Sequence, residues 1–453
     1  MPCRATLTQL TQVLAASPIN LSDAVASTYK GITTDTRSLK PGEVFVALRG
    51  EKFDGHEFVT QAIASGAIAA IVDLQYQDRA LPLLQVQDTL HAYQQIASWW
   101  RQQLKIPVIG VTGSVGKTTT KELIAAVLGT QGNVLKTHAN YNNEIGVPKT
   151  LLELEPTHDF AVIEMAMRAK GEIALLTQLV RPTVGVITNV GTAHIERLGS
   201  EDAIARAKCE LLAEMPSDSV AILNHDNPRL IATAKTVWQG QTLTYGLQGG
   251  DLHGELIDAQ TIRVEGLKLP LPLPGQHNAS NFLAALAVAK VLQIDWSSLA
   301  AGLEVNLPSG RSQRYELAND VILLDETYNA APEAMVASLQ LLAQTPGKRH
   351  IAVLGAMKEL GSRSQELHQQ VGAMVGQLNL DALLILVDGE DAKAIARSAE
   401  GIPSECFTTH QALLERLVEV VKEGDRILFK AAHSVRLDRV VNQFRTEFLN
   451  ETN

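Results

Sequence analysis

A glycine-rich turn between an apolar run and an amphipathic stretch constrains this chain more than any other feature. Residues 108–120 read VIGVTGSVGKTTT, in which a β-branched run leads through Gly113 and Gly116 into Lys117 and Thr118. A strand, a glycine turn, a Lys-Thr pair and a helix in this order direct backbone N–H groups and a helix N-terminus at an anion. The stretch therefore predicts a phosphate-binding loop, in which Lys117 adds a mobile charge and a hydroxyl is available to Mg²⁺.

The spacing departs from the usual P-loop pattern at one position. The pattern G-x-x-x-x-G-K-[ST] requires glycine at position 111, where this chain has Val111. The alternative interpretation is a simple strand-to-helix turn with a lysine nearby. Because strand, both glycines, lysine and threonine coincide, we favour the phosphate loop.

Length and composition indicate a multi-domain globular protein. At about 150 residues per domain, 453 residues suggest three domains. A hydrophobic content of 45% with 19% charged residues is typical of globular proteins. The net charge of −10, without a long Lys/Arg run, argues against binding to nucleic acid or to anionic membranes.

The sequence also indicates a compartment. Its three cysteines, Cys3, Cys209 and Cys406, are widely spaced, which favours isolated buried thiols in a reducing compartment over disulfides or a zinc site. Gln and Thr interrupt the apolar runs of the first twenty residues, which makes them a poor signal peptide. No stretch of about 20 apolar residues occurs, so we expect a cytoplasmic protein without membrane insertion, acting as a monomer.

Periodicity predicts alternating strands and helices throughout, and hence parallel sheets covered by helices on both faces. Three α/β domains are expected at 1–86, 87–307 and 308–453. The first would contain helices 7–15 and 58–65 and strands 44–48 and 69–72, and residues 88–104 would form a connecting helix. In the second we expect strands 134–135, 160–164, 183–188 and 220–223, helices 172–179, 203–214 and 278–292, and an antiparallel excursion over 246–274. In the third we expect strands 321–324, 351–354, 382–387 and 426–429, with helices 332–342 and 365–375.

Three polar residues follow the predicted central strands. Glu164 ends a buried strand, at the edge of a parallel sheet where ligands bind, and it either holds Mg²⁺ or forms a cap or ion pair. His194 lies in the loop after another strand, where a structural histidine is the commoner case. Lys208 lies in the next helix, and from the sequence alone an ordinary surface lysine is the expected interpretation.

Two further segments lack hydrophobic periodicity. Residues 140–148 cluster the amides of Asn142 and Asn143 in a loop, and such loops carry function more often than packing. In residues 274–281, Asn278 is predicted to cap the following helix, which would leave Asn281 in the first turn, free to bind a base.

Taken together, these residues resemble the Mur ligase family, ATP-dependent enzymes that build the peptide of bacterial cell-wall precursors. The motifs TGxxGKT, NYNNEIGVP, Glu164, TNVGxAH and PGQHNxxN match in the expected order, over nearly the whole chain. The family has its own variant of the P-loop, which accounts for Val111. The resemblance implies a small N-terminal α/β UDP-binding domain, a central parallel-sheet P-loop ATPase domain and a C-terminal Rossmann-like α/β domain.

The two ends of the chain resemble the member that adds D-alanyl-D-alanine. The run TDTRSLKPGEVFVALRG is similar to the UDP-binding first domain of members that add the third residue or the terminal dipeptide. Gly310-Arg311 and DETYNAAP at 325–332 are similar to the last domain of the dipeptide-adding member. Departures from that pattern are Glu326, Ala331, Ala356 and His433.

Roles follow from the resemblance, residue by residue. Lys117, Lys208, His194 and Glu164 would be catalytic. ATP would be bound by Gly113, Ser114, Val115, Gly116, Lys117, Thr118, Thr119, Asn281, Arg311 and Glu326. Two Mg²⁺ ions are implied, with Thr118 and Glu164 at one and His194 and a carbamylated Lys208 at the other. The substrates would contact Thr36, Arg37, Ser38, Asn142, Asn143, Tyr328 and Asn329.

The implied reaction has two steps. The terminal carboxylate of UDP-N-acetylmuramoyl-tripeptide attacks the γ-phosphate of ATP, which gives an acyl phosphate and ADP. The amine of D-alanyl-D-alanine then displaces phosphate. The alternatives are the ligase that adds the third, diamino residue, a folylpolyglutamate synthase, and a nucleotide-switched binding protein without ligase activity.

Overall fold

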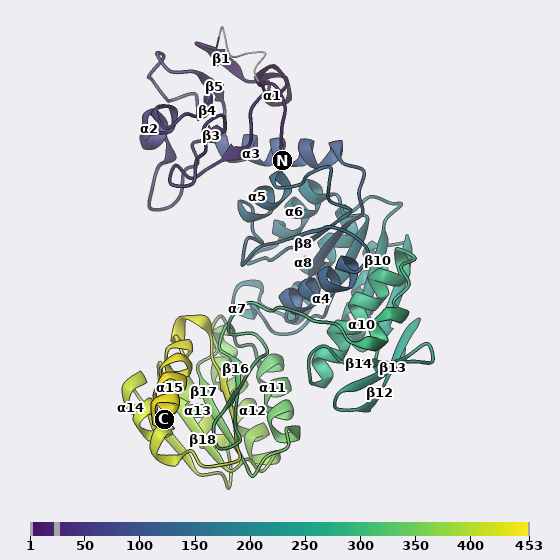
Figure 1. Cartoon of the computed structure of the whole chain (residues 1–453), viewed down its shortest axis with the longest axis vertical. Helices are drawn as coiled ribbons and strands as arrows, with labels where there is room; N and C mark the ends of the chain where they lie inside the picture. Colours follow the sequence, from purple (N-terminus) through teal and green to yellow (C-terminus); the bar gives the residue numbers. More distant parts are fainter. Residues whose placement is uncertain (1–2, 22–27, 452–453) are drawn as a thin grey trace.

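The computed structural model describes residues 3–21 and 28–451, which form three lobes in chain order (Figure 1). The first contains a sheet in the order β1-β5-β4-β3-β2, in which only the β1–β5 pair is antiparallel. Its strands are β1 (Ser17–Ile19), β2 (Ile32–Thr33), β3 (Val44–Val46), β4 (Ala69–Asp73) and β5 (Leu83–Val86). The helices are α1 (Leu7–Leu14), η1 (Gly55–Phe58) and α2 (Val59–Ala64).

The central sheet has the order β14-β13-β12-β11-β10-β9-β6-β8-β7 in the described part of the chain. Its strands are β6 (Val108–Thr112), β7 (Val134–Lys136), β8 (Phe160–Glu164), β9 (Val184–Ile187), β10 (Val220–Asn224), β11 (Gln241–Gly246), β12 (Leu252–Asp258), β13 (Thr261–Val264) and β14 (Leu267–Pro270). Pairing is parallel from β7 to β12 and antiparallel from β12 to β14. The predicted antiparallel excursion is therefore confirmed for β12–β14, whereas β11 belongs to the parallel part.

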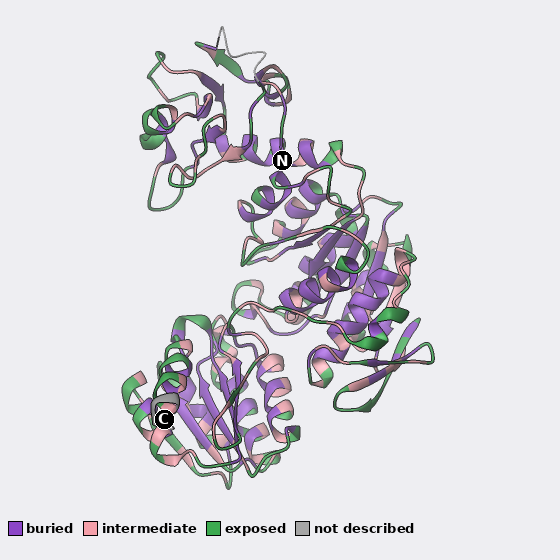
Figure 2. Cartoon of the chain, in the orientation of Figure 1, coloured by how far each residue is buried: buried purple, intermediate pink, exposed green. Residues whose placement is uncertain are grey.

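Helices cover both faces of this sheet, as predicted, because its strands carry apolar side chains on both sides (Figure 2). They are α3 (Thr89–Gln103), α4 (Lys117–Gly129), α5 (Gly146–Leu152), α6 (Glu172–Val180), α7 (Ile195–Leu198), α8 (Glu201–Glu214), α9 (Pro228–Val237), α10 (Gln276–Val291) and η2 (Ser297–Ala301). Val111 is fully buried in the core that α4 and α10 share with the sheet. Its side chain therefore fills the core beneath the loop, and position 111, where the P-loop pattern has glycine, is a packing position in this chain.

The first lobe and the central domain share one hydrophobic core. α3 supplies Tyr93, Ile96 and Ala97 to a cluster that includes Ile71 of β4 and Ile163 of β8. Trp100 of the same helix donates its indole N–H to the carbonyl of Leu154 at 2.9 Å. The connecting helix predicted over 88–104 therefore packs against both domains.

The C-terminal sheet has the order β15-β16-β20-β17-β18-β19 in the described residues, with β15 antiparallel and the rest parallel. Its strands are β15 (Gln313–Leu317), β16 (Val321–Glu326), β17 (Arg349–Gly355), β18 (Ala382–Leu386), β19 (Ser404–Phe407) and β20 (Asp425–Lys430). The helices are α11 (Pro332–Gln344), η3 (Gly361–Arg363), α12 (Ser364–Gln377), α13 (Glu390–Ser398), α14 (His410–Val420), η4 (His433–Val435) and α15 (Asp438–Glu451). Sequence periodicity missed β15, α13, β19, α14 and α15.

Two sequence expectations about surface and membrane can be compared with the fold. Among the described residues, no helix is both long and apolar enough to cross a bilayer. All three thiols are free, and Cys3 and Cys209 are buried, but Cys406 is exposed at the edge strand β19. The expectation of three buried thiols was therefore wrong for Cys406, because an edge strand is covered on fewer sides.

Candidate active site

The glycine turn forms a loop between β6 and the N-terminus of α4, as the sequence predicts. Gly116 occupies the N-cap with φ +80°, and a Cβ there would lie 2.6 Å from Asn281 Oδ1. At Gly113 a Cβ would lie 1.9 Å from Thr188 Oγ1, so neither position accepts a side chain. Lys117 folds back over the loop and donates to the carbonyls of Gly113 at 2.8 Å and Ser114 at 3.3 Å.

The loop after β9 clamps this turn from the side. Asn189 accepts from the N–H of Val115 at 3.0 Å and donates to its carbonyl at 3.1 Å. Thr188 donates to the same carbonyl at 2.7 Å, and Ser114 accepts from the N–H of Gly191 at 2.9 Å. These bonds hold the backbone in a rigid concave shape before any anion binds.

Glu164 ends β8 beside the turn, with its side chain nearly inaccessible to solvent. Thr118 donates to Oε2 at 2.9 Å and Asn142 donates to Oε1 at 2.8 Å. The structure thus brings together Thr118 and Glu164, both predicted at one metal, and adds Asn142, which was predicted to contact substrate. Asn143 has a different contact, accepting from the N–H of Gly146 at 2.9 Å to start α5.

Lys208 is buried in α8 with only 1% of its surface exposed. No hydrogen bond or ion pair links its ammonium to any described residue, and burial, with the charge of Lys117 second, holds its pKa well below the usual value. The surface-lysine interpretation was therefore wrong. His194 lies close enough to both lysines for their charges to act on it, and burial is the main cause that lowers its pKa. Burial therefore shifts the protonation equilibrium of both side chains toward the uncharged form.

The N-terminal region of α10 differs from the sequence prediction. Gly275 occupies the N-cap, whereas Asn278 lies inside the helix and donates to the carbonyl of Pro274 at 2.8 Å. Asn281 is consequently one turn further along. It accepts from Thr120 at 3.1 Å and donates to Asn278 at 3.4 Å, so part of its amide braces the phosphate loop, while its contact with a base stays a prediction. Glycine takes the cap because the backbone there has φ +100°.

A cavity of about 780 Å³ opens between the central and C-terminal domains. It is lined by loop residues Ser114 to Thr119, by Asn281 of α10, and by Arg311, Glu326, Tyr328 and Asn329 of the C-terminal domain. The Arg311 guanidinium lies 3.9 Å from the centre of the Tyr328 ring. The centres of the His433 and Tyr328 rings are 5.5 Å apart. The structure thus brings together the residues predicted to bind ATP from two domains.

Glu326, at the end of β16, is held in this cavity by two partners. Ser312 donates to Oε1 at 3.0 Å, and the buried Lys430 lies 3.6 Å from Oε2. Burial lowers the pKa of Lys430, and the charge of Glu326 opposes that shift. The carboxylate is therefore fixed in place rather than free to swing.

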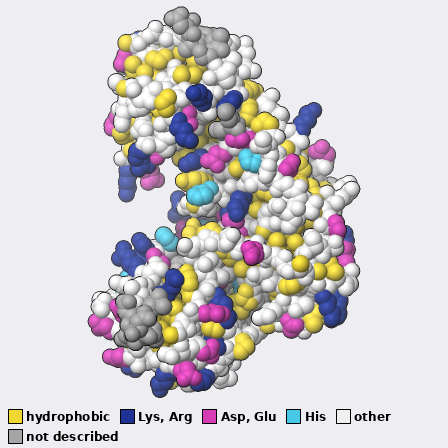
Figure 3. Space-filling model, in the orientation of Figure 1, with side chains coloured by type: hydrophobic (Ala, Val, Ile, Leu, Met, Phe, Trp, Pro, Cys, Tyr) yellow, Lys and Arg dark blue, Asp and Glu magenta, His cyan; other side chains and the backbone are white. Residues whose placement is uncertain are grey.

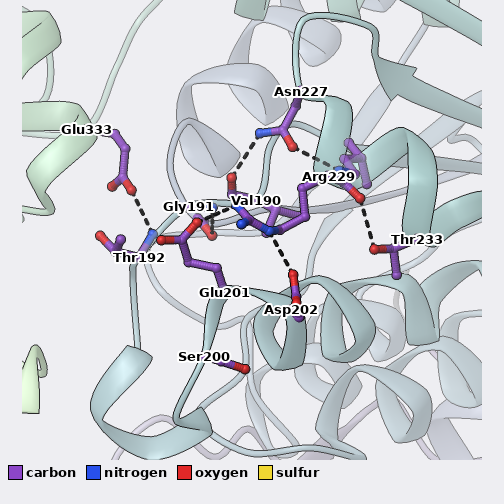
Figure 4. A network of polar contacts seen from close by, with 12 residues as sticks. Val190, Gly191, Thr192, Ser200, Glu201, Asp202, Asn227, Arg229, Thr233 and Glu333 are labelled. Carbon is purple, nitrogen blue, oxygen red and sulfur yellow. Dashed lines mark hydrogen bonds and ion pairs between the residues drawn. The ribbon is translucent and has the colours of Figure 1, made fainter.

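Figure 4 shows a second contribution of the C-terminal domain, at the loop that follows β9. Glu333 of α11 points at the backbone of Thr192 and accepts from its N–H at 2.7 Å. Asn227 donates to the carbonyl of Val190 at 2.9 Å in the same network. The Oε2 atom of Glu333 and the Oγ1 atom of Thr192 are buried without a partner in the described part of the molecule.

The residues predicted to bind the uridine part lie away from this cavity. Arg37 is exposed and pairs with Asp35 at 2.7 Å, which lowers the pKa of Asp35 to about 2. The charge of Lys149 of α5 also lowers the pKa of Asp35, so the loop with Thr36 and Ser38 faces the central domain. Figure 3 shows a hollow between the upper and lower lobes, bordered by basic and histidine side chains. A long substrate could span this hollow.

Sequence reasoning missed several contributors. Asn189 and Thr188 clamp the turn, Thr120 anchors Asn281, and Glu333 and Glu359 reach across the domain boundary. Asn189 was within a matched motif, which is a signal that could have identified it. No local pattern indicated the partners of Glu333 and Glu359, because those partners are more than 100 residues away in the chain.

Comparison with known proteins agrees with this geometry. Three family models match consecutive parts of the chain: the Mur ligase family catalytic domain over residues 28–101, the Mur ligase middle domain over 111–289, and the Mur ligase glutamate ligase domain over 310–433. The chain is 57% identical to the UDP-N-acetylmuramoyl-tripeptide–D-alanyl-D-alanine ligase of Synechocystis sp., covering 95% of both chains. It is 39% identical to the Escherichia coli ligase of the same name, covering 96% of this chain and 97% of that one.

Solved structures agree as well. A crystal structure of MurF from Acinetobacter baumannii matches with a TM-score of 0.90 and 32% identity, covering 98% of this chain and 99% of that one. MurF from Thermotoga maritima in complex with ADP matches with a TM-score of 0.82 and 31% identity, covering 93% and 98%. The three-domain α/β architecture expected from the sequence is confirmed.

Proposed function

The chain belongs to the Mur ligase family, and we propose on that premise that it joins D-alanyl-D-alanine to UDP-N-acetylmuramoyl-tripeptide with conversion of ATP to ADP and phosphate. The observation that carries this choice within the family is 57% identity over 95% of a ligase of that name. The reaction produces a peptidoglycan precursor. The ligase that adds the third, diamino residue is not favoured.

ATP occupies the cavity between the central and C-terminal domains in this proposal. The N–H groups of residues 113–119 and the N-terminus of α4 receive the β- and γ-phosphates. Lys117 moves from the carbonyls of Gly113 and Ser114 to the phosphate oxygens, since those carbonyl bonds are weaker than bonds to an anion. Arg311 and Glu326 bind the nucleotide from the other domain.

The donor set fits Mg²⁺ at the phosphate loop. Thr118 Oγ1 and Glu164 Oε2 lie 2.9 Å apart, and a hydroxyl with a carboxylate is the kind of oxygen pair that Mg²⁺ binds beside phosphates. His194 and Lys208 would serve a second ion. No three His, Cys, Asp or Glu side chains converge in the described residues, so these residues would hold an ion only together with oxygens of the bound substrates. Bound Mg²⁺ supplies neutralisation of phosphate charge.

Lys208 fits carbamylation because its amine is buried, has no partner in the described part of the chain, and has a pKa shifted toward the neutral form. A neutral amine attacks CO₂ through its lone pair, forms an N–C bond and releases one proton, which leaves an anionic carbamate. A carbamate presents oxygens to a cation, whereas an ammonium would repel it. This state of Lys208 is a proposal that rests on burial and on the charge around it.

The chain's residues then position two reactions in turn. The tripeptide carboxylate is held in line with the γ-phosphate, and Lys117 neutralises the charge that develops during transfer. The amine of D-alanyl-D-alanine, bound near Tyr328 and Asn329, attacks the acyl carbon and phosphate leaves. Docking of the C-terminal domain excludes water, which would otherwise hydrolyse the acyl phosphate.

A phosphate-release assay tests the proposal. We expect release that requires UDP-N-acetylmuramoyl-tripeptide, D-alanyl-D-alanine and ATP together, with each omission as a control. Turnover with UDP-N-acetylmuramoyl-dipeptide and a diamino acid would instead identify the third-residue ligase. Positional isotope exchange in ATP, with tripeptide alone, checks for the acyl phosphate, and a nucleotide-switched binding protein would show no exchange.

The proposed location is the cytoplasm, where ATP and the nucleotide-linked substrates are available. The three free thiols are consistent with a reducing compartment.

A further inference from the structure

His194 receives its closest polar contact from the other domain. Its Nδ1 lies 2.5 Å from Oε2 of Glu359, in the loop that follows β17 of the C-terminal domain. The N–H of Glu196 donates to the carbonyl of Glu359 at 3.2 Å, and Arg197 Nε lies 3.7 Å from Glu359 Oε1. Glu359 is therefore fixed to the His194 segment by its backbone and by both carboxylate oxygens.

The two loops are shaped for this contact. His194 and Glu359 both have left-handed backbones, with φ of +68° and +61°, which cost a non-glycine residue about 1–2 kcal/mol each. Gly361 follows with φ +54°, and a Cβ there would lie 3.2 Å from the Cα of Glu196. Two unfavourable conformations at one interface indicate a specific contact, since a chance encounter would leave both residues in relaxed geometry.

The chemistry of the pair determines the tautomer of the ring. An ionised carboxylate only accepts hydrogen bonds, so Nδ1 of His194 must carry the proton. In the neutral ring, a proton on Nδ1 that is donated to Glu359 leaves the lone pair on Nε2. Histidines that bind metals usually donate their second N–H to a carboxylate, which orients the ring and makes the binding nitrogen more basic.

We propose that Glu359 is a positioning residue that fixes the tautomer and orientation of His194 and so couples docking of the C-terminal domain to metal binding at Nε2. The metal-binding half of this inference rests on the proposed function, in which His194 serves the second ion. Glu333 provides a matched contrast, because it reaches the same segment from the same domain but, among the described residues, its hydrogen bond goes to the backbone of Thr192.

The tautomer is tested on the full-length protein without metal or nucleotide, by ¹⁵N NMR of labelled histidines. The His194 signals are identified by their loss in His194→Asn. We expect a proton on Nδ1 in the wild type, in Glu359→Gln, whose amide oxygen still accepts, and in Glu333→Ala. Glu359→Ala should populate the other tautomer. An unchanged tautomer in Glu359→Ala would overturn the inference.

Metal binding is tested with Mn²⁺ by electron paramagnetic resonance, in the presence of a non-hydrolysable ATP analogue and the tripeptide substrate. We expect Glu359→Ala to raise the Kd of one of two ions by about 10–100-fold, and Glu359→Gln to raise it much less. The other ion, and both ions in Glu333→Ala, should bind as in the wild type.

Three results would contradict the inference or its premise in distinguishable ways. An unchanged or lower Kd in Glu359→Ala would mean that Glu359 does not support the metal-binding nitrogen. An equal loss in Glu333→Ala would assign the effect to domain docking alone. A wild type that binds one Mn²⁺ would refute the second ion of the proposed function, while the tautomer measurement would still decide the role of Glu359.

Discussion

Two fully buried lysines, on helices that pack into different hydrophobic cores of the central domain, should respond to the same substitution with opposite signs. Lys121 of α4 donates to the carbonyl of Thr137 at 2.7 Å and pairs with Glu122 at 2.9 Å. Lys208 of α8 has no such partner among the described residues, and burial lowers its pKa. Methionine has a similar length and no charge, so Lys121→Met and Lys208→Met form a matched pair.

The magnitudes follow from what each amine loses. A buried polar group without a hydrogen bond costs about 1–3 kcal/mol, so Lys208→Met should raise the free energy of unfolding by about that amount. Lys121→Met leaves the carbonyl of Thr137 without its donor, while Glu122 keeps its ion pair with Lys136, so this variant should lower the free energy of unfolding by about 1–3 kcal/mol. Lys208→Met should also lose most ligase turnover, and bicarbonate should restore none of it.

The stability difference should depend on pH with a defined sign. Folding lowers the pKa of Lys208, so below the usual lysine value of about 10.4 the unfolded chain binds a proton that the folded chain does not. Wild-type stability therefore falls as the pH falls from that value toward the folded pKa, and Lys208→Met lacks this loss. The advantage of the variant should be larger near about pH 8 than near about pH 10.

Urea unfolding followed by tryptophan fluorescence measures this directly. The four tryptophans, Trp99, Trp100, Trp238 and Trp296, all lie in the central part of the chain that contains both lysines. Buffers free of CO₂ keep the amine of Lys208 unmodified. If Lys208→Met destabilised the protein as much as Lys121→Met, the unpartnered-amine argument would be wrong, and near-normal turnover of Lys208→Met would exclude the carbamate.

Three further variants test the phosphate loop. Gly116→Ala places a Cβ 2.6 Å from Asn281 Oδ1 at φ +80°, so it should lower the free energy of unfolding by about 1–2 kcal/mol. The variant should also bind a fluorescent ATP analogue more weakly, and an unchanged Kd would contradict the rigid-loop argument. Lys117→Met should lower kcat by about 10²–10³-fold. The unfolding midpoint should change little, because the present bonds of Lys117 are to loop carbonyls. A kcat within a few-fold of wild type would refute the role of Lys117 in neutralising phosphate charge. Glu164→Gln should shift the Mg²⁺ concentration for half-maximal phosphate release upward by about tenfold or more, whereas the same midpoint as wild type would remove Glu164 from the metal site.

The extent of sequence prediction can be seen in particular elements. The strand–turn–helix at residues 108–129, the strand ending at Glu164 and the parallel alternation were all identified, because apolar periodicity and glycine positions are local properties. The elements missed in the last domain have a local reason too. α13 begins with Glu390 and Asp391 and buries only Ala392, Ala394 and Ile395, and β19 is a four-residue edge strand with two exposed positions.

The candidate site likewise combines features that local sequence patterns predict with features that only the folded chain shows. The sequence by itself determined that a phosphate loop, a carboxylate and a histidine would meet at one sheet edge, because the alternation of strands and helices and the P-loop pattern are local properties of the chain. Only the tertiary structure decided that Lys208 is buried without a partner among the described residues, that Asn281 braces Thr120, and that Glu359 reaches His194. These facts depend on packing between residues 161 to 165 positions apart, or on burial by several elements at once, and no local pattern encodes them.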